Sequence, residues 1–376
     1  MTIIMNYYYI LLVLLACSCS SNNQKGVIVF DMRKHYPEKE IYIQDICDVS
    51  YVLIDDSIVV SGRPKVVTDF YIIFSNSDQE FVFYDMQGHF VKKFCHAGQG
   101  PGEYPYIGSV VYDSFVNQLI VCHDNKILYY TMDGQFIKSN SIDTQYFLWD
   151  VKNYNKEYLL CDNNQSLSSA YIFVSKETGK IKDSIDLRLK ENIEPYISVK
   201  ENGMIFKYSP YFYNLVKVRE GFLLSQISAD TFYILNEKKE IKPIFTRLPS
   251  IHEQSIPIFV NAWVESNQYY FLSTVEKKYD PSTDEGFAQA YFMIEKEGEK
   301  IYIPKIRNKD IEDNNVELDP RTIERTVDMR IGIAILNTED LLKSYKEGKI
   351  KSQKLIDIVK KMKEDSNPVI MFMNFK

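Results

Sequence analysis

The sequence predicts an all-β protein with the architecture of a β-propeller. Apolar strands and polar turns repeat at intervals of about 45 residues, the length of one propeller blade. Glycines mark corresponding turns of successive copies at Gly88, Gly134 and Gly179, where a hairpin needs a residue with positive φ. Aromatic residues form 14% of the 376 positions, with 28 Tyr and 22 Phe, and these types favour half-buried strands.

The N-terminus predicts an exported protein. Residues 1–16 carry no charged side chain, and their apolar run is too short to span a bilayer. They are typical of a signal peptide. The segment Leu14-Leu15-Ala16-Cys17 resembles the lipobox of bacterial lipoproteins, which implies a lipid on Cys17 and a tether over 17–26. The alternatives are lipidation at Cys19, which lacks the leading Leu, and a buried N-terminal strand.

The glycine-rich stretch FCHAGQGPGEYPYIG follows the first hairpin and precedes the next blade. Its core contains Gly98, Gly100, Pro101, Gly102 and Glu103. A dinucleotide fingerprint would need a helix after the glycines, whereas the residues that follow alternate as a strand. We therefore predict a structural blade-to-blade crossing, in which Glu103 caps free backbone N–H groups.

The crossing and its flanking hairpin look like an NHL-type propeller repeat. The chain resembles the six-bladed β-propeller lipoproteins of the Bacteroidota over nearly all of its mature length. The similarity includes 36–57, the stretch 306–320, and the ending 361–376. In 306–320 the family has an Asn-Asp-Ile-Asp loop, but here Lys309 separates Asn308 from Asp310. The resemblance implies a six-bladed propeller anchored to the outer membrane by its lipid. The absence of acidic residues between Cys17 and Asp31 favours the periplasmic side.

Six blades then fit one propeller over 27–376. The expected blades are 61–95, 106–141, 147–187, 211–248, 258–306, and a last blade in which 49–55 joins strands from 329–336 and 368–375. A helical insertion over 338–365 precedes the closing strand. Thr338 and Ser352 are the expected N-caps of two short helices separated at Gly348.

Catalytic motifs are sparse. The run Cys122-His123-Asp124 offers nucleophile and base types, but adjacent strand residues face opposite sides of a sheet. No cysteine spacing matches a zinc motif, so we expect cysteines that are free, buried and unreactive. Exported proteins do form disulfides, although the spacing assigns none.

Acidic residues supply the candidate cation sites. Asp310, Glu312 and Asp313 carry the oxygen ligands that Ca²⁺ prefers, although the register of a calcium loop is missing; a solvated insertion is the other interpretation. Asp69, Asp113 and Asp150 each lie at a predicted inner strand, where they would bind calcium at the channel mouth or form turns.

Two functions remain open. The first is a non-enzymatic lipoprotein of the cell envelope that binds a protein, peptide or glycan through its disc face or channel mouth. The alternative is a calcium-dependent hydrolase or lactonase with carboxylates at the channel mouth. The net charge of −7 argues against nucleic acid as a partner, because such binding relies on basic residues that neutralise phosphates.

Overall fold

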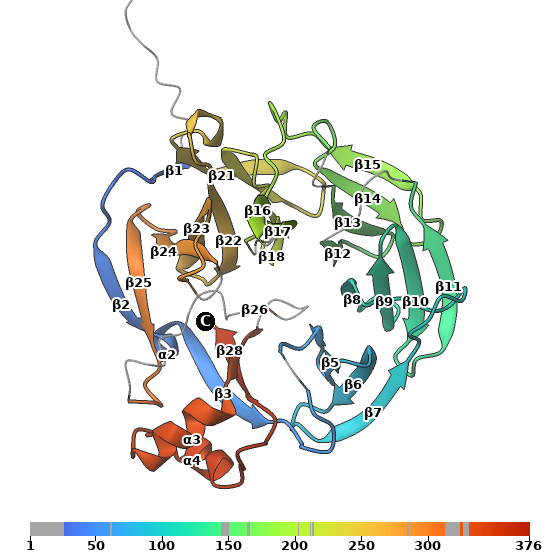
Figure 1. Ribbon diagram of the computed structural model, residues 1–376, viewed down its shortest axis with the longest axis vertical. Coiled ribbons are helices and arrows are strands. Elements are labelled where there is room, and N and C mark those ends of the chain that lie inside the picture. The colour runs from blue at the N-terminus through green and yellow to red at the C-terminus, as the bar shows by residue number, and fades with distance from the viewer. Residues whose placement is uncertain are drawn as a thin grey trace, which may run out of the picture.

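Six sheets, each built on four antiparallel strands, stand around a central axis in the computed structural model (Figure 1). This confirms the predicted six-bladed β-propeller. The residues that the structure describes are 26–60, 62–143, 150–163, 166–201, 203–210, 212, 214–283, 286–312, 324–325 and 331–376. The predicted signal peptide, Cys17, Cys19 and most of the tether lie outside them.

The blades follow one another in chain order, and each predicted blade is found within a few residues of its expected place. Blade one contains β4 (Val66–Val67), β5 (Ile72–Ser75), β6 (Glu80–Tyr84) and β7 (Phe90–Cys95). Blade two contains β8 (Ser109–Asp113), β9 (Gln118–His123), β10 (Lys126–Thr131) and β11 (Phe136–Ser141). Blade three contains β12 (Val151–Asn153), β13 (Tyr158–Asp162), β14 (Tyr171–Ser175) and β15 (Ile181–Ile185).

The second half of the ring has longer strands. Blade four contains β18 (Leu215–Val218), β19 (Gly221–Leu224), β20 (Thr231–Leu235) and β21 (Ile241–Leu248). Blade five contains β22 (Ile258–Glu265), β23 (Tyr269–Tyr279), β24 (Phe287–Glu295) and β25 (Ile301–Arg307). Blade six contains β26 (Glu324–Arg325), β27 (Ile331–Leu336), β28 (Val369–Phe375) and, from the other end of the chain, β3 (Cys47–Leu53).

The two ends of the chain close the ring in blade six. Strand β28 pairs with β27 on one side and with β3 on the other, so that Met371 lies opposite both Ala334 and Tyr51. The predicted closure is confirmed. Two further N-terminal strands add an outermost parallel strand to blades four and five: β1 (Ile28–Asp31) beside β21, and β2 (Glu38–Tyr42) beside β25. The sequence did not predict the place of these strands at the rim, where they cover otherwise open sheet edges.

Alternation along the strands fills the interfaces between blades. In β13, Leu159 and Cys161 pack against blade two, whereas Leu160 packs against blade four. An apolar cluster of this kind lies between each pair of neighbouring blades. A single sheet could not bury both of its faces alone, so the stacking of blades around the axis supplies the core.

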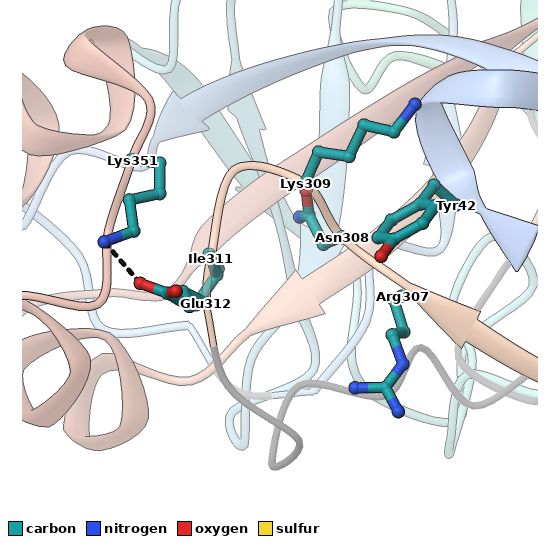
Figure 2. Close-up of a pocket in the computed structure, with 7 residues that line it drawn as sticks. All are labelled: Tyr42, Arg307, Asn308, Lys309, Ile311, Glu312 and Lys351. Atoms are coloured by element: carbon teal, nitrogen blue, oxygen red, sulfur yellow. Dashed lines mark ion pairs between the residues drawn. The ribbon is translucent and has the colours of Figure 1, made fainter. Parts of the chain in front are cut away.

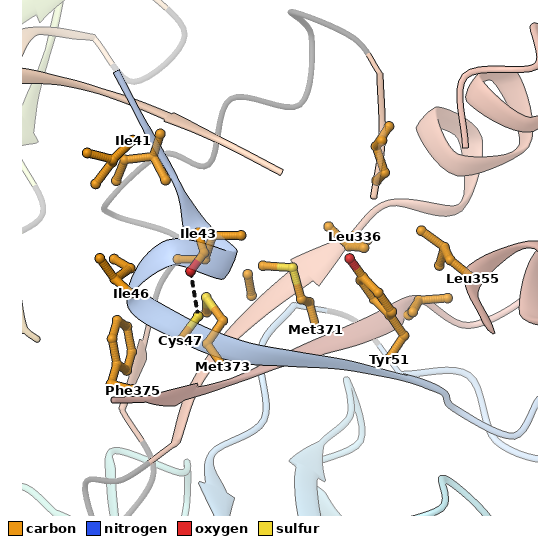
Figure 3. Packing of buried hydrophobic residues seen from close by; sticks show 14 of the residues in the cluster. Ile41, Ile43, Ile46, Cys47, Tyr51, Leu336, Leu355, Met371, Met373 and Phe375 are labelled. Atoms are coloured by element: carbon orange, nitrogen blue, oxygen red, sulfur yellow. Dashed lines mark hydrogen bonds between the residues drawn. The ribbon is translucent and has the colours of Figure 1, made fainter. Parts of the chain in front are cut away.

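The C-terminal insertion forms two helices, α3 (Thr338–Lys346) and α4 (Gln353–Val359), as predicted. Leu355 of α4 enters the same apolar cluster as Tyr51 of β3 and Met371 of β28 (Figure 3). The short helix α2 (Ile43–Ile46) joins this cluster, and the Cys47 thiol donates to its Ile43 carbonyl oxygen at 3.1 Å. Among the described residues, no helix combines the length and apolar character needed to cross a membrane.

The capping of these helices differs from the prediction. Thr338 was expected as an N-cap, but the cap is Asn337, and the Thr338 hydroxyl instead donates to the Ser366 carbonyl oxygen at 3.0 Å. That bond joins the start of α3 to the end of the insertion. Ser352 does occupy the N-cap of α4, although its side chain makes no capping hydrogen bond.

Candidate functional site

The two faces of the propeller differ in the length of their connections. Strands in a blade are antiparallel, so the first and third turns of a blade lie at one face, and the second turn and the blade-to-blade crossings lie at the other. At the first face, the short-turn face, none of the described turns is longer than five residues. The other face, the long-connection face, carries the connections 54–65, 96–108, 186–214, 308–323 and 337–368.

A two-stranded hairpin rises from the long-connection face. It comprises β16 (Ile197–Glu201) and β17 (Met204–Tyr208), within the insertion that follows blade three. Met204 and Ile205 near its tip are 59% and 70% exposed. At its base, the Tyr208 ring stacks on Tyr279 of blade five with centroids 4.2 Å apart. The hairpin therefore presents apolar side chains to solvent from an anchored base.

The glycine-rich crossing lies between β7 and β8 on this same face. The Glu103 carboxylate accepts a hydrogen bond from the Gly100 N–H at 2.8 Å. A Cβ at Gly98 would collide with that carboxylate, and a Cβ at Gly102 would come within 2.8 Å of the Phe136 ring. The glycines thus leave room for the capping carboxylate and the next blade.

Tyr104 anchors the crossing to blade one, a role that the sequence pattern does not predict. The side chain is fully buried. Its hydroxyl donates to the Gln79 carbonyl oxygen at 3.0 Å and accepts from the His96 N–H at 3.1 Å. Pro101 lies in the turn between Gly100 and Glu103, which is closed by the Glu103 N–H bond to the Gly100 carbonyl oxygen at 3.1 Å. These contacts give the crossing a structural part in joining two blades.

The Cys122-His123-Asp124 run forms no nucleophilic arrangement. Cys122 packs in the core between blades two and three, and burial raises the pKa of its thiol to about 12. The Nδ1 atom of His123 lies 3.5 Å from Oδ2 of Asp124. Because adjacent strand residues alternate, the His123 side chain lies on the face of the sheet opposite to Cys122. Of the cysteines in the described ranges, Cys47, Cys122 and Cys161 are buried and Cys95 is exposed, and none of these four forms a disulfide.

The structure does not bring Asp69, Asp113 and Asp150 to one end of the axis. Asp69 lies in a turn of the short-turn face and Asp113 ends β8 at that face, whereas Asp150 precedes β12 at the long-connection face. Asp113 instead forms a buried ion pair with Lys176, with 2.6 Å between Oδ2 and Nζ. These three carboxylates therefore cannot share one calcium ion at a channel mouth, and that interpretation is wrong.

The carboxylates of the acidic loop face separate partners. Asp310 accepts a hydrogen bond from the Tyr51 hydroxyl at 2.7 Å, and Glu312 pairs with Lys351 of the helical insertion. Asp313 lies outside the described residues. In the part of the chain that the structure describes, no group of three or more His, Cys, Asp or Glu side chains is placed to hold a metal ion.

A pocket of about 660 Å³ opens beside this loop, between the outer edge of blade five and the helical insertion (Figure 2). The residues that line this pocket, the rim pocket, are Tyr42, Arg307, Asn308, Lys309, Ile311, Glu312 and Lys351. Three of these are basic and one is acidic, and each basic side chain is paired with a carboxylate, so the lining favours a polar ligand rather than an anion.

Neighbouring side chains hold the pocket in shape. The Lys309 ammonium lies over the Tyr42 ring at 5.0 Å and pairs with Asp45 of α2. Arg307 pairs with Glu40 of β2 at 2.7 Å. Because Tyr42 and the acidic partners Glu40 and Asp45 come from N-terminal segments, the pocket could not be assembled from sequence spacing alone.

Comparison with known families matches residues 27–374 to the family described as Domain of unknown function (DUF4934). The chain belongs to the DUF4934 family. No curated protein matches the sequence. DUF4934 therefore places the chain in a family without assigning an activity to it.

Structures of other proteins resemble the fold of this DUF4934 protein. A crystal structure described as that of an exported protein from Bacteroides fragilis NCTC 9343 has a TM-score of 0.61 at 16% identity, and covers 93% of this chain and 99% of that one. A member of the DUF4221 family from Bacteroides vulgatus ATCC 8482 has a TM-score of 0.47 at 10% identity, covering 88% and 97%. The Pan2 WD40 domain of Neurospora crassa has a TM-score of 0.42 at 8% identity, covering 83% and 89%. The first of these shows a shared fold, and nothing finer follows at such identities.

Proposed function

We propose that this DUF4934 protein is a non-enzymatic binding propeller of the cell envelope, which engages a protein, peptide or glycan through its long-connection face. The observation that carries the proposal is the gathering of long connections, projecting hairpin and helical insertion on one face. Binding residues occur most often on loops that a rigid scaffold positions, and six interlocked blades form such a scaffold.

The chemistry of this face suits a partner with both polar and apolar parts. The rim pocket contributes Tyr42, Arg307 and Lys351, a combination of aromatic surface and hydrogen-bond donors that suits sugars or polar peptides. The hairpin contributes the exposed side chains of Met204 and Ile205. An exposed apolar surface of this kind is typical of a site for protein contacts.

The proposal includes a location in the cell envelope. Cys17 would carry the lipid, 17–26 would form the tether, and the propeller would face the periplasm from the outer membrane. An NHL-like origin of the blades belongs to the same proposal. Support comes from the lipobox-like sequence and from the exported Bacteroides protein of similar fold. Replacing Cys17 with Ser and following membrane fractionation tests the anchor, which is wrong if the variant still fractionates with membranes.

Site-specific photo-crosslinking in living cells tests the binding face. A photoreactive residue at Ile205, 70% exposed on the hairpin, is compared with one at Phe115, 56% exposed in a turn of the short-turn face. We expect a discrete adduct from position 205 and none of that mass from position 115. Identical adducts from both positions, or none from position 205, would contradict the proposal.

The alternative of a calcium-dependent hydrolase or lactonase rested on carboxylates that gather at one channel mouth. Asp113 and Asp150 lie at opposite faces, and Asp113 is taken up by Lys176. The arrangement predicted for that alternative therefore does not support it, and binding is the function that the geometry favours.

A further inference from the structure

Two carboxylates face each other across the inner strands of blade three, at the long-connection face. Val151 of β12 pairs with Cys161 of β13, so Asp150 and Asp162 are the next cross-strand neighbours. The Asp162 N–H donates to the Asp150 carbonyl oxygen at 2.9 Å. Cross-strand neighbours have Cβ atoms about 5 Å apart on the same side of a sheet, and like charges there are destabilising.

Both side chains point toward blade four. Asp162 follows the same alternation as Leu160, which packs in the interface between blades three and four. Asn214, which precedes β18 of blade four, donates from its amide nitrogen to Asp162 Oδ2 at 2.7 Å. The Tyr171 hydroxyl donates to the Asn214 carbonyl oxygen at 2.6 Å. The carboxyl pair is therefore enclosed by residues of two blades.

The charge of this group is incompletely balanced. Asp162 is 2% exposed, and burial raises its carboxyl pKa to about 8, with a further contribution from Asp150. Lys152 pairs with Asp150 Oδ1 at 2.8 Å, and its side chain is 34% exposed. One lysine is therefore available to balance two carboxylates, and it pairs with Asp150, the more exposed of the two.

The atoms without partners here are all oxygens. Asp150 Oδ2, Asp162 Oδ1, Asn163 Oδ1 and Asn214 Oδ1 are buried and accept no hydrogen bond from the described residues. Buried polar atoms are normally paired, and each exception calls for an explanation. A set of acceptors with no donor lacks either protons or a cation, and it would repel an anion.

We propose that Asp150 and Asp162, completed by the amide oxygen of Asn214, hold a divalent cation of the Ca²⁺ type at the long-connection mouth of the channel. Ca²⁺ takes carboxylate and amide oxygens in flexible geometry. Asp150 keeps 17% of its side chain exposed, which leaves a route for the ion. With two carboxylates and amide oxygens as ligands, this site is of a different composition from a cluster of three acidic or histidine side chains.

The bound ion would join blade three to blade four. Asp150 and Asp162 belong to one blade and Asn214 to the other, so the ion would tie the base of the hairpin insertion 186–214 to the ring. The site stands independently of the proposed partner binding, because its ligands lie beneath the face rather than on it.

Thermal unfolding of the purified full-length protein in EDTA and in Ca²⁺ tests the site. At pH 8 we expect a midpoint that rises with the logarithm of free Ca²⁺, as for any ligand that binds the folded state alone. At pH 5 the rise should shrink, because protons compete with the ion for Asp162. Mg²⁺ should have a smaller effect, since it demands rigid octahedral geometry and retains its waters.

Asp162→Asn is the decisive variant, and Glu312→Gln in the rim pocket is its matched control. We expect Asp162→Asn to lose the calcium response while being at least as stable as wild type in EDTA at pH 8, because it removes a buried charge. The control should respond as wild type does. If Asp162→Asn does not fold, Asp150→Asn on the partly exposed ligand gives the same comparison.

Terbium luminescence gives a direct reading of binding, because Tyr171 lies beside the site and can sensitise the emission of a bound Tb³⁺. We expect Ca²⁺ to displace the signal and Asp150→Asn to weaken Tb³⁺ binding by about tenfold or more. An unfolding midpoint at pH 8 that does not change with the Ca²⁺ concentration would show that Asp162 binds a proton and no cation. That result, or an equal calcium response in wild type and Asp162→Asn, would overturn the proposal.

Discussion

A buried ion pair joins blades two and three and allows a sharp test of how the ring is held together. Lys176 Nζ lies 2.6 Å from Asp113 Oδ2, and the two side chains are 8% and 3% exposed. The ammonium also donates to Asn153 Oδ1 at 2.6 Å. Burial lowers the Lys176 pKa, and its hydrogen bond to Asp113 opposes that shift. The three residues come from the ends of β14, β8 and β12, so they link neighbouring blades at the short-turn face.

Lys176→Met keeps the aliphatic length of the side chain and removes the charge, leaving Asp113 buried without a cation. Breaking a buried pair from one side costs about 3–5 kcal/mol of unfolding free energy. Adding Asp113→Asn removes the stranded charge and retains an acceptor for the Phe115 N–H. The double variant should therefore lose less than Lys176→Met alone, about 1–2 kcal/mol.

Urea denaturation at pH 7, analysed by linear extrapolation, measures both losses. Lys93→Met is the matched control, because it breaks a more exposed pair with Glu80, 47% and 19% exposed, worth about 0.2–1 kcal/mol. A loss for Lys176→Met no larger than for this control would refute the reasoning. So would a double variant that loses as much as Lys176→Met alone.

Three further predictions concern single sites. Tyr104→Phe should cost about 1–3 kcal/mol by urea denaturation, because it removes the partner of two partly buried backbone groups; Tyr106→Phe, on a side chain 45% exposed, should cost little, and equal losses would contradict the assignment. Gly102→Ala should lower the unfolding midpoint, since its Cβ would lie 2.8 Å from the Phe136 ring, and an unchanged midpoint would show that the crossing can shift. In calcium-free buffer, stability should fall as pH rises from about 4 to 8, because the folded Asp162 pKa of about 8 exceeds its ordinary 3.8 and the folded state holds the extra proton in that window; the slope is up to about 1.4 kcal/mol per pH unit, and Asp162→Asn should abolish it.

The blades were predictable because their signal is local. Gly88, Gly134 and Gly179 have φ of 88°, 83° and 71°, so each occupies a turn that only a permissive residue fills comfortably. Where the fourth copy lacks glycine, Lys239 adopts a φ of 65°. Turn spacing and strand alternation repeat along the chain, and together they specify a blade without reference to its neighbours.

The candidate sites were less predictable because they depend on which end of which strand a residue occupies. Asp113 and Asp150 look alike in sequence, as acids next to inner strands. One lies at the short-turn face beside Lys176, and the other lies at the opposite face beside Asp162. Nothing in the sequence near Asp162 points to Asn214 of the next blade, which donates to it at 2.7 Å.

By itself, the sequence determined the repeated blades and the helical insertion, since each follows from patterns within some tens of residues. The closure that brings 49–55 beside 368–375 was expected instead from the need to complete a sixth blade with strands from both ends of the chain. Tertiary structure alone decided that the glycine crossing rests on Tyr104, that β1 and β2 line the rim, and that two carboxylates meet Asn214 between blades. The physical reason is the range of the interactions involved. Strand periodicity depends on neighbouring residues, whereas a buried charge meets its partner only when separate blades stack face to face.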